Sequence, residues 1–366
     1  MASIFPSRRV RRTPFSDGVT AAGVRGYTVY NHMLLPTMFH SIEADYRHLK
    51  SAVQVWDVSC ERQVEVKGPD ARRMIQLLTP RDLSKLSPGR CMYIPVVDQM
   101  GGMLNDPVLV EVTPDTYWIS IADSDFLQWV LCFAGTGGFD VEVREPDVSP
   151  LAIQGPGADD LAARVFGEAV RDLRFFGCKR FEFQGQSWIV ARSGYSKQGG
   201  FEIYVEGSEN GMAIWDALFA AGQDMDVRAG CPNLIERIEG GLLSYGNDMT
   251  RENSPLECGL GKYVSENQLE TCVGGRALRE ELDAGPKQMI RAIAIHGVTP
   301  LHDRAWPLLA GDRQVGQVTS AAWSPDFDTG VGIGMVARSH WEAGTKLVLQ
   351  TPEGTVDATV RAEFWI

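Results

Sequence analysis

The segment ARSGYSKQGGFEIYV, just past the middle of the chain, alternates apolar and polar residues after a glycine turn. Glu202 and Tyr204 lie between Phe201, Ile203 and Val205, and this two-residue period is typical of a strand with one buried face. We therefore expect Glu202 and Tyr204 to share one face of a strand and the three apolar side chains to cover the other.

Periodicity predicts a mixture of helices and strands elsewhere. Helical spacing predicts helices over 38–52 and 70–78, and over the segments DFLQWVLCF, DDLAARVF and GMAIWDALFAAG. Alternation and turn residues predict strands in VWDVS, RQVEVKG, CMYIPVVD, PVLVEV and TYWISIA. From residue 285 onward only short strands follow, and this predicts a small C-terminal β-barrel.

Charge and composition limit the class of partner. The chain has 366 residues, of which 44% are hydrophobic, and a formal net charge of −12. A chain of this length can build two or three domains. This net negative charge argues against nucleic acid or an anionic membrane as the main partner, so we expect the partners to be small molecules.

The N-terminus carries Arg8, Arg9, Arg11 and Arg12 without an apolar run behind them, which argues against a secretory signal. No apolar stretch approaches the roughly 20 residues that span a bilayer. Seven cysteines are scattered without a CxxC pair, which favours reduced thiols in a cytoplasmic protein. Because the six histidines are equally dispersed, we expect no metal site.

Several motifs occur along the chain in a fixed order. They are VWDVS (55–59), GGMLND (101–106), the FEIYV strand, SYGNDM and SPLECGLGKYV (254–264). Together they resemble the aminomethyltransferase (glycine-cleavage T-protein) family across nearly the whole chain. Within that family, RRTPFSDGV, YTVYNHMLLP and SYGNDMTRENSPLECGLGK most resemble the tetrahydrofolate-dependent demethylases of dimethylsulfoniopropionate.

The resemblance implies an α+β fold. Its form is the three-domain cloverleaf ring of the aminomethyltransferase type, with two interleaved α+β domains and a C-terminal β-barrel. The implied boundaries are 1–50 with 147–240 for a folate-binding domain, 51–146 with 241–284 for a second domain, and 285–366 for the barrel. Neither the ring nor the interleaving follows from periodicity alone.

The resemblance also implies a folate site. A buried carboxylate can face the two parallel N–H donors of the pterin, and the family glutamate that does so matches Glu202. An isolated strand glutamate would ordinarily be exposed. For Arg237, an intramolecular ion pair fits the sequence as well as folate does. The positions implied to bind folate are Glu202, Tyr195, Tyr93, Ser120, Ala122, Asp123, Phe176 and Arg237.

Two residues are implied to act in catalysis: Asp106, held near N5 or N10 of the folate, and Tyr204, as a wall of the reaction centre. Asn105 replaces the first of two aspartates usual in aminomethyltransferases, and Lys262 replaces their tryptophan. Both departures point away from glycine-cleavage chemistry. Tyr195 stands where the demethylases more often carry tryptophan, so the methyl donor stays open.

A sulfonium zwitterion would carry a methyl carbon already activated by its positive leaving group, so displacement by tetrahydrofolate requires no metal. The cation calls for aromatic faces, for which the candidates are Tyr30, Tyr93, Phe176, Tyr195 and Tyr204. The substrate carboxylate needs a donor, which Lys197, His32 or backbone amides could provide. Ser244 matches a family position that points toward the centre.

We therefore expect a cytoplasmic, tetrahydrofolate-dependent methyltransferase that demethylates dimethylsulfoniopropionate to 3-(methylthio)propionate. A demethylase of another sulfonium or quaternary amine is the first alternative, and an aminomethyltransferase of glycine cleavage is the next. A non-enzymatic folate-binding protein of iron–sulfur assembly is disfavoured, because its KGCYxGQE motif is not reproduced by SGYSKQGG. The sequence leaves a homodimer open.

Overall fold

A computed structural model describes residues 7–297 and 299–366. The chain forms two compact units, each assembled from separate segments. The first takes in the chain up to Ala71, then Leu86–Met92 and Val108–Asn233; the second contains Arg72–Lys85, Tyr93–Pro107 and Leu234–Ile366. The three-domain boundaries implied by the sequence stay a prediction.

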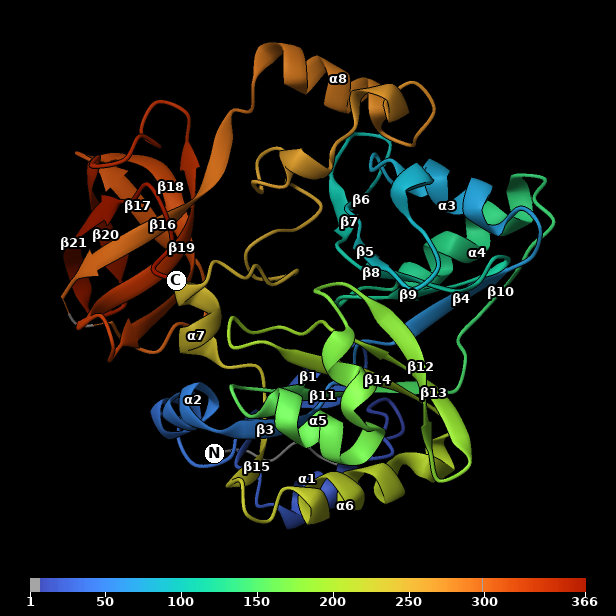
Figure 1. Ribbon diagram of the computed structural model, residues 1–366. Helices are drawn as coiled ribbons and strands as arrows, with labels where there is room; N and C mark the ends of the chain where they lie inside the picture. Colours follow the sequence, from blue (N-terminus) through green and yellow to red (C-terminus); the bar gives the residue numbers. More distant parts are fainter. Residues whose placement is uncertain (1–6, 298) are drawn as a thin grey trace. The chain divides into compact units, whose positions relative to one another are not determined.

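A six-stranded sheet is the centre of the first unit (Figure 1). Its spatial order is β12 (Cys178–Phe183), β13 (Gln186–Ala191), β14 (Gly200–Glu206), β11 (Val148–Gln154), β3 (Val53–Asp57) and β15 (Val227–Gly230). The expected alternation in β14 is confirmed. Phe201, Ile203 and Val205 join the large core that includes Leu161 and Leu218 of the covering helices, whereas Tyr204 belongs to a separate cluster on the other face.

The first unit contains five helices and two 3-10 turns among the described residues. They are α1 (Ser16–Ala21), α2 (Ile42–Ser51), α4 (Phe126–Thr136), α5 (Ala158–Phe166) and α6 (Gly211–Ala221), with 3-10 turns η2 (Glu168–Asp172) and η3 (Ser208–Asn210). Ser41 caps α2, because its side chain accepts a hydrogen bond from the Ala44 backbone N–H at 3.0 Å. All five predicted helical segments contain a helix, counting α3 of the second unit.

A five-stranded sheet and a hairpin complete the first unit. The sheet order is β10 (Glu142–Arg144), β4 (Gln63–Lys67), β9 (Thr116–Ser120), β8 (Val108–Thr113) and β5 (Cys91–Tyr93). Val110 and Trp118 of this sheet meet Ile189 and Tyr204 of the six-stranded sheet in one buried cluster. The hairpin pairs β1 (Gly26–Tyr30) with β2 (Met33–Met38).

The predicted single strand CMYIPVVD is wrong, because the structure divides it. Cys91–Tyr93 forms β5 of the five-stranded sheet, whereas β6 (Val96–Val97) pairs with β7 (Met103–Asn105) in the second unit. Pro95 stands between the two strands. Proline has no backbone N–H to donate to a ladder, so strand pairing stops there.

The second unit contains helices beside a closed barrel. The helical elements are α3 (Ala71–Leu78), η1 (Leu83–Lys85), α7 (Leu234–Glu239), η4 (Gly261–Tyr263), η5 (Glu266–Gln268) and α8 (Gly275–Ala284). Their shared core includes Ile238 of α7, Leu278 of α8 and Ile333 of the barrel wall. Within the described part of the chain, no helix is both long and apolar enough to cross a membrane.

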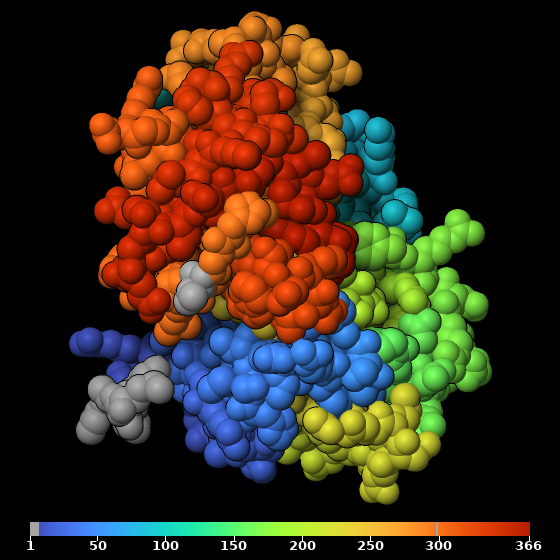
Figure 2. Space-filling view, turned by 90° about the vertical axis from the view of Figure 1, so that its left-hand side faces the viewer, coloured from blue at the N-terminus to red at the C-terminus, as the bar shows by residue number. Residues whose placement is uncertain are grey.

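The predicted C-terminal barrel is confirmed. Its closed order is β16 (Gln288–His296), β19 (Thr329–Ala337), β18 (Arg313–Ser324), β17 (Trp306–Ala310), β20 (Lys346–Thr351) and β21 (Gly354–Val360). These strands are drawn in orange and red, and Figure 2 shows their outer surface. A Cβ at Gly334 would lie 2.9 Å from a side-chain carbon of Ile293, so glycine in β19 makes room for large residues inside the barrel.

Candidate functional site

A tyrosine and an aspartate from separate strands meet in the second unit. Tyr93 ends β5, and Asp106 directly follows β7. The Tyr93 hydroxyl donates to Asp106 Oδ2 at 2.8 Å, whereas Asp106 Oδ1 is buried and finds no hydrogen-bond partner within residues 7–297 and 299–366. Burial raises the pKa of Asp106 to about 7, although the Tyr93 hydrogen bond opposes the shift. The Asp106 carboxyl is therefore a buried hydrogen-bond acceptor whose pKa lies close to neutral pH.

Further aromatic and cationic residues surround this pair. The rings of Tyr93 and Tyr263 lie with centroids 5.2 Å apart, and the Arg81 guanidinium stacks on Tyr263 at 4.6 Å. Arg81 also donates to the backbone carbonyl of Tyr93. Burial, followed by the charge of Asp106, raises the pKa of Tyr93 well above its usual value. Tyr93 therefore stays a neutral donor throughout the physiological pH range.

Sequence reasoning missed Arg81 and Tyr263. Tyr263 lies within the motif SPLECGLGKYV, so its place in a recognised motif is a sequence signal that could have identified it. Arg81 lies in no recognised motif, and the contact between it and Tyr263 depends on tertiary folding. Tyr245 also contacts this region. Its hydroxyl donates to the carbonyl of Met103 in β7 at 3.0 Å, and Asp106 directly follows β7.

Arg237 of α7 lies in a saturated buried network. It donates to Asp248 Oδ2 at 2.8 Å and to Ser320 Oγ at 2.6 Å, while Ser320 and Thr319 donate to Asp248 Oδ1 at 2.6 and 2.8 Å. The Ser244 backbone N–H completes the set at 2.9 Å. The ion pair that the sequence left open as an alternative is therefore formed, and the folate contact of Arg237 stays a prediction, as does the site role of Ser244.

Glu202 is buried in the first unit. Its cross-strand neighbours are two small residues, Ala191 on β13 and Ala152 on β11. The residue is 7% exposed, and Ser193 Oγ donates to Glu202 Oε2. Burial raises the pKa of Glu202. A buried carboxylate with a neutral hydroxyl partner retains acceptor capacity for a ligand.

Tyr204, on the same face, is 1% exposed. Its ring lies 6.0 Å from that of Trp118, whose indole N–H donates to Glu65 Oε2 at 2.9 Å. Arg144 in turn donates to Glu65 Oε1 at 2.7 Å. These contacts make Tyr204 part of the core between the two sheets, and its catalytic role stays a prediction.

Three other predicted residues lie on loops and turns of the first unit. Tyr195 packs against the cluster that contains Trp56, whereas Lys197 is exposed. Phe176 adopts φ 59°, a left-handed conformation that is rare for a bulky residue and stores strain. Its ring contacts Phe175, with centroids 4.7 Å apart.

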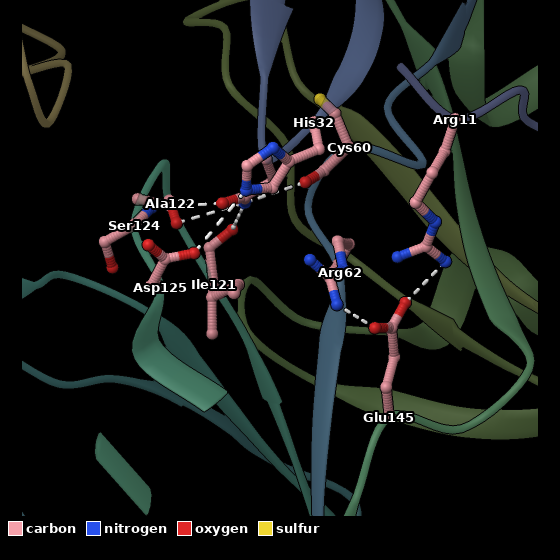
Figure 3. A network of polar contacts seen from close by, with 10 residues as sticks. Arg11, His32, Cys60, Arg62, Ile121, Ala122, Ser124, Asp125 and Glu145 are labelled. Atoms are coloured by element: carbon pink, nitrogen blue, oxygen red, sulfur yellow. Dashed lines mark hydrogen bonds and ion pairs between the residues drawn. The ribbon is translucent and has the colours of Figure 1, made fainter. Parts of the chain in front are cut away.

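Four predicted residues lie at or near the turn of the β1–β2 hairpin. Tyr30 and His32 flank Asn31 in the turn, and Asn31 bonds Ala122 and Asp123. Figure 3 shows His32 and Ala122 in this group. The Asn31 side-chain amide donates to the carbonyls of Cys60 at 2.9 Å and Ala122 at 3.1 Å. Its backbone N–H donates to Asp123 Oδ1 at 2.7 Å, and Asn31 Oδ1 accepts from the Ser124 N–H at 3.0 Å. His32 remains exposed, 3.5 Å from Asp125. Sequence reasoning missed Asn31, although an Asn-His pair between two strands is a turn signal.

The Ser120 hydroxyl is used within the five-stranded sheet, where it accepts a hydrogen bond from Gln63 Nε2 at 2.9 Å.

The predicted residues fall into groups within each unit. Tyr93 and Asp106 bond directly, the hairpin group shares one turn, and Glu202 and Tyr204 share one strand face. Their assignment to folate or substrate stays a prediction.

Comparison with known proteins identifies the family. Two family models match the chain: the GCVT N-terminal domain over residues 15–268, and the glycine cleavage T-protein C-terminal barrel domain over residues 291–365. The chain belongs to the aminomethyltransferase family. The family predicted from the motifs is therefore confirmed.

Relatives within the aminomethyltransferase family cover the whole chain. The dimethylsulfoniopropionate demethylase DmdA of Ruegeria pomeroyi is 64% identical over 365 residues, which is 100% of both chains. The aminomethyltransferase of Bacillus pumilus is 29% identical over 361 residues, covering 96% of this chain and 98% of that protein. The crystal structure of the glycine cleavage system aminomethyltransferase T from Bartonella henselae has a TM-score of 0.86 at 24% identity and 98% coverage of both chains. This likeness, with the barrel, confirms the predicted α+β fold class.

Proposed function

We propose that this protein is a tetrahydrofolate-dependent methyltransferase that demethylates dimethylsulfoniopropionate. The products are 3-(methylthio)propionate and 5-methyltetrahydrofolate. The observation that carries the proposal is the 64% identity, over the full length of both chains, to the Ruegeria pomeroyi demethylase. The aminomethyltransferase of Bacillus pumilus is far less similar, at 29%. The cytoplasmic location and the homodimer stay predictions.

Two buried carboxylates fit a ligand rich in N–H donors. Asp106 Oδ1 is buried and has no hydrogen-bond partner in the described part of the chain, and Glu202 has the neutral Ser193 hydroxyl beside it. An unpaired buried acceptor is costly unless a ligand satisfies it. The family resemblance assigns Glu202 to the 2-amino group and N3 of the pterin, and Asp106 to the folate nitrogen that reacts.

Tetrahydrofolate, when bound, supplies the nucleophilic N5 that takes the methyl group as the carbon–sulfur bond breaks and its electron pair stays on sulfur. Asp106 can accept the proton released from that nitrogen, because a pKa of about 7 matches a general base to neutral pH. The Tyr93 hydroxyl fixes the other oxygen of Asp106 and so directs Oδ1. Alignment of two bound reactants supplies much of the remaining rate.

For the sulfonium cation, the candidate aromatic faces are those predicted from the sequence: Tyr30, Tyr93, Phe176, Tyr195 or Tyr204. Each face contributes roughly 0.5–2 kcal/mol to cation binding. For the carboxylate end of the substrate, the sequence candidates are Lys197, His32 and backbone amides. Both side chains are exposed.

An anaerobic end-point assay with purified protein tests the proposal. The protein is incubated with tetrahydrofolate and dimethylsulfoniopropionate, with glycine betaine as a parallel substrate, and products are separated by chromatography. We expect equal amounts of 5-methyltetrahydrofolate and 3-(methylthio)propionate, and no dimethylglycine. Methyl transfer from glycine betaine alone would overturn the substrate assignment.

A further inference from the structure

Two cations lie against one tyrosine in the second unit. The Arg81 guanidinium stacks on the Tyr263 ring at 4.6 Å, and Lys262 Nζ lies 4.9 Å from the same ring. Lys262 and Tyr263 are neighbours in η4, whereas Arg81 lies between α3 and η1. We name Arg81, Lys262 and Tyr263 the cation cluster.

Neither cation of the cluster has a carboxylate partner. Across residues 7–297 and 299–366, no Asp or Glu oxygen lies within ion-pair distance of Arg81 or Lys262. Other arginines of this unit are paired, such as Arg237 with Asp248 at 2.8 Å and Arg279 with Glu266 at 3.0 Å. An uncompensated, partly buried charge is unfavourable and is stabilised when an anion binds. Burial accordingly lowers the pKa of Arg81.

Arg81 is also held in a defined position. Its backbone N–H donates to Thr79 Oγ1 at 3.1 Å, and its carbonyl accepts from Gln76 Nε2 at 2.8 Å. One guanidinium nitrogen, Nη1, donates to the Tyr93 carbonyl. The edge formed by Nε and Nη2 makes no hydrogen bond within the described chain and can bind both oxygens of a carboxylate.

The cluster adjoins the candidate reaction centre. Tyr263 packs on Tyr93 with ring centroids 5.2 Å apart, and Tyr93 donates to Asp106. A short zwitterion could therefore place its carboxylate at the cluster while its methylated cation reaches the aromatic face of Tyr93.

We infer that Arg81 and Lys262 bind the carboxylate of the zwitterionic sulfonium substrate and so select it over cations that lack a carboxylate. The inference rests on the proposed function, and names a residue pair that sequence reasoning did not assign. Lys262 provides a mobile point charge, whereas Arg81 provides the bidentate geometry.

Substrate preference tests the inference. The ratio of kcat/KM for dimethylsulfoniopropionate to that for ethyldimethylsulfonium, which lacks the carboxylate, is measured for the full-length protein and for Arg81→Gln and Lys262→Gln. We expect the ratio to fall roughly 10- to 100-fold in Arg81→Gln, as loss of a charged hydrogen bond implies, and several-fold in Lys262→Gln. The KM for tetrahydrofolate should not change.

Two control variants separate the alternatives. Arg279→Gln removes a paired surface arginine of the same unit, and Lys197→Gln removes the sequence candidate. An unchanged ratio in both cluster variants, a fall in Lys197→Gln alone, or a shift confined to the KM for tetrahydrofolate would overturn the inference. Lys262 is exposed on η4, so Lys262→Gln keeps the test valid if Arg81→Gln does not fold. If the unsubstituted protein turns over neither sulfonium, the proposed function fails and the inference falls with it.

Discussion

Two buried aspartate side chains of the second unit differ in how their oxygens are satisfied. Asp248 is 1% exposed, and both of its oxygens accept hydrogen bonds, from Arg237, Ser320, Thr319 and the backbone of Ser244. For Asp106, the Tyr93 hydroxyl donates to Oδ2, whereas Oδ1 is buried and has no hydrogen-bond partner among the described residues.

The difference separates a structural carboxylate from a functional one. Asp248 is neutralised by Arg237 and joins α7 to the barrel strand β18, so its charge is used within the fold. Burial raises the pKa of Asp106, and groups with perturbed pKa values concentrate at active sites. We therefore expect replacement of Asp106 to affect mainly activity, and replacement of Asp248 to affect mainly stability.

The largest expected effect is on turnover in Asp106→Asn. This change keeps the shape of the side chain but removes its ability to accept a proton, so kcat should fall roughly 10²- to 10⁴-fold. Steady-state assays at saturating folate measure the loss. Thermal unfolding of the same variant should show no fall in melting temperature. A variant with a lowered melting temperature and normal turnover would mean that Asp106 is a structural carboxylate and not a functional one.

Asp248→Ala should destabilise the second unit by roughly 3–5 kcal/mol, because it leaves Arg237 buried without its partner. Denaturant unfolding of the wild type and of Asp248→Ala measures this change in the free energy of unfolding. The double variant Asp248→Ala with Arg237→Leu should recover part of the loss. If the single substitution costs nothing, the network does not support the fold.

The pKa of Asp106 predicts a pH effect on stability. The unfolded chain ionises this group near pH 3.8, whereas the folded protein keeps its proton up to about pH 7. Between these values the folded state binds more protons, so stability falls as pH rises, by up to about 4 kcal/mol. Unfolding at pH 5 and pH 8 should show a loss in the wild type that Asp106→Asn lacks. Identical pH profiles for the two proteins would refute the raised pKa.

Glu202 extends the comparison to the first unit, since it too is a buried carboxylate with a raised pKa. Glu202→Gln should weaken tetrahydrofolate binding roughly 10- to 100-fold, because a charged hydrogen bond is worth about 1.5–3 kcal/mol. Isothermal titration measures the affinity, and the KM for the sulfonium substrate serves as the control. Unchanged folate affinity would remove Glu202 from the folate site.

Tyr93→Phe should have the smallest effect. Loss of one neutral hydrogen bond to Asp106 costs about 1 kcal/mol and leaves both oxygens of the carboxylate without a donor. The pH dependence of kcat should therefore shift to a higher apparent pKa. A shift to lower pH would mean that the hydroxyl does not stabilise the ionised carboxylate.

Sequence patterns predicted the parts of the structure that depend on local periodicity. The alternation around Glu202 and the strand-only tail are both visible in a short window, and both are confirmed as β14 and the barrel. Pro95 is the sequence signal for the break between β5 and β6, because proline cannot donate to a strand ladder. Asp106 entered the candidate site only through family resemblance, because a Gly-Gly turn followed by Asn-Asp is otherwise a hairpin signal.

The sequence could not predict contacts between residues far apart in the chain. Arg81 meets Tyr263 across more than a hundred residues, and Asn31 bonds the 121–124 segment from a distant hairpin. No local pattern encodes such pairs. Likewise, the sequence could not distinguish Asp106 from Asp248, since what distinguishes them is the number of donors that tertiary folding brings to each.

Transfer of an isotopic label tests the central claim most directly. Dimethylsulfoniopropionate with deuterated S-methyl groups is incubated anaerobically with tetrahydrofolate and either the wild type or Asp106→Asn, and the folate products are analysed by mass spectrometry. We predict that the wild type forms 5-methyltetrahydrofolate carrying an intact deuterated methyl group, and that Asp106→Asn forms almost none. Unlabelled folate product, or equal labelling by both proteins, would contradict the account.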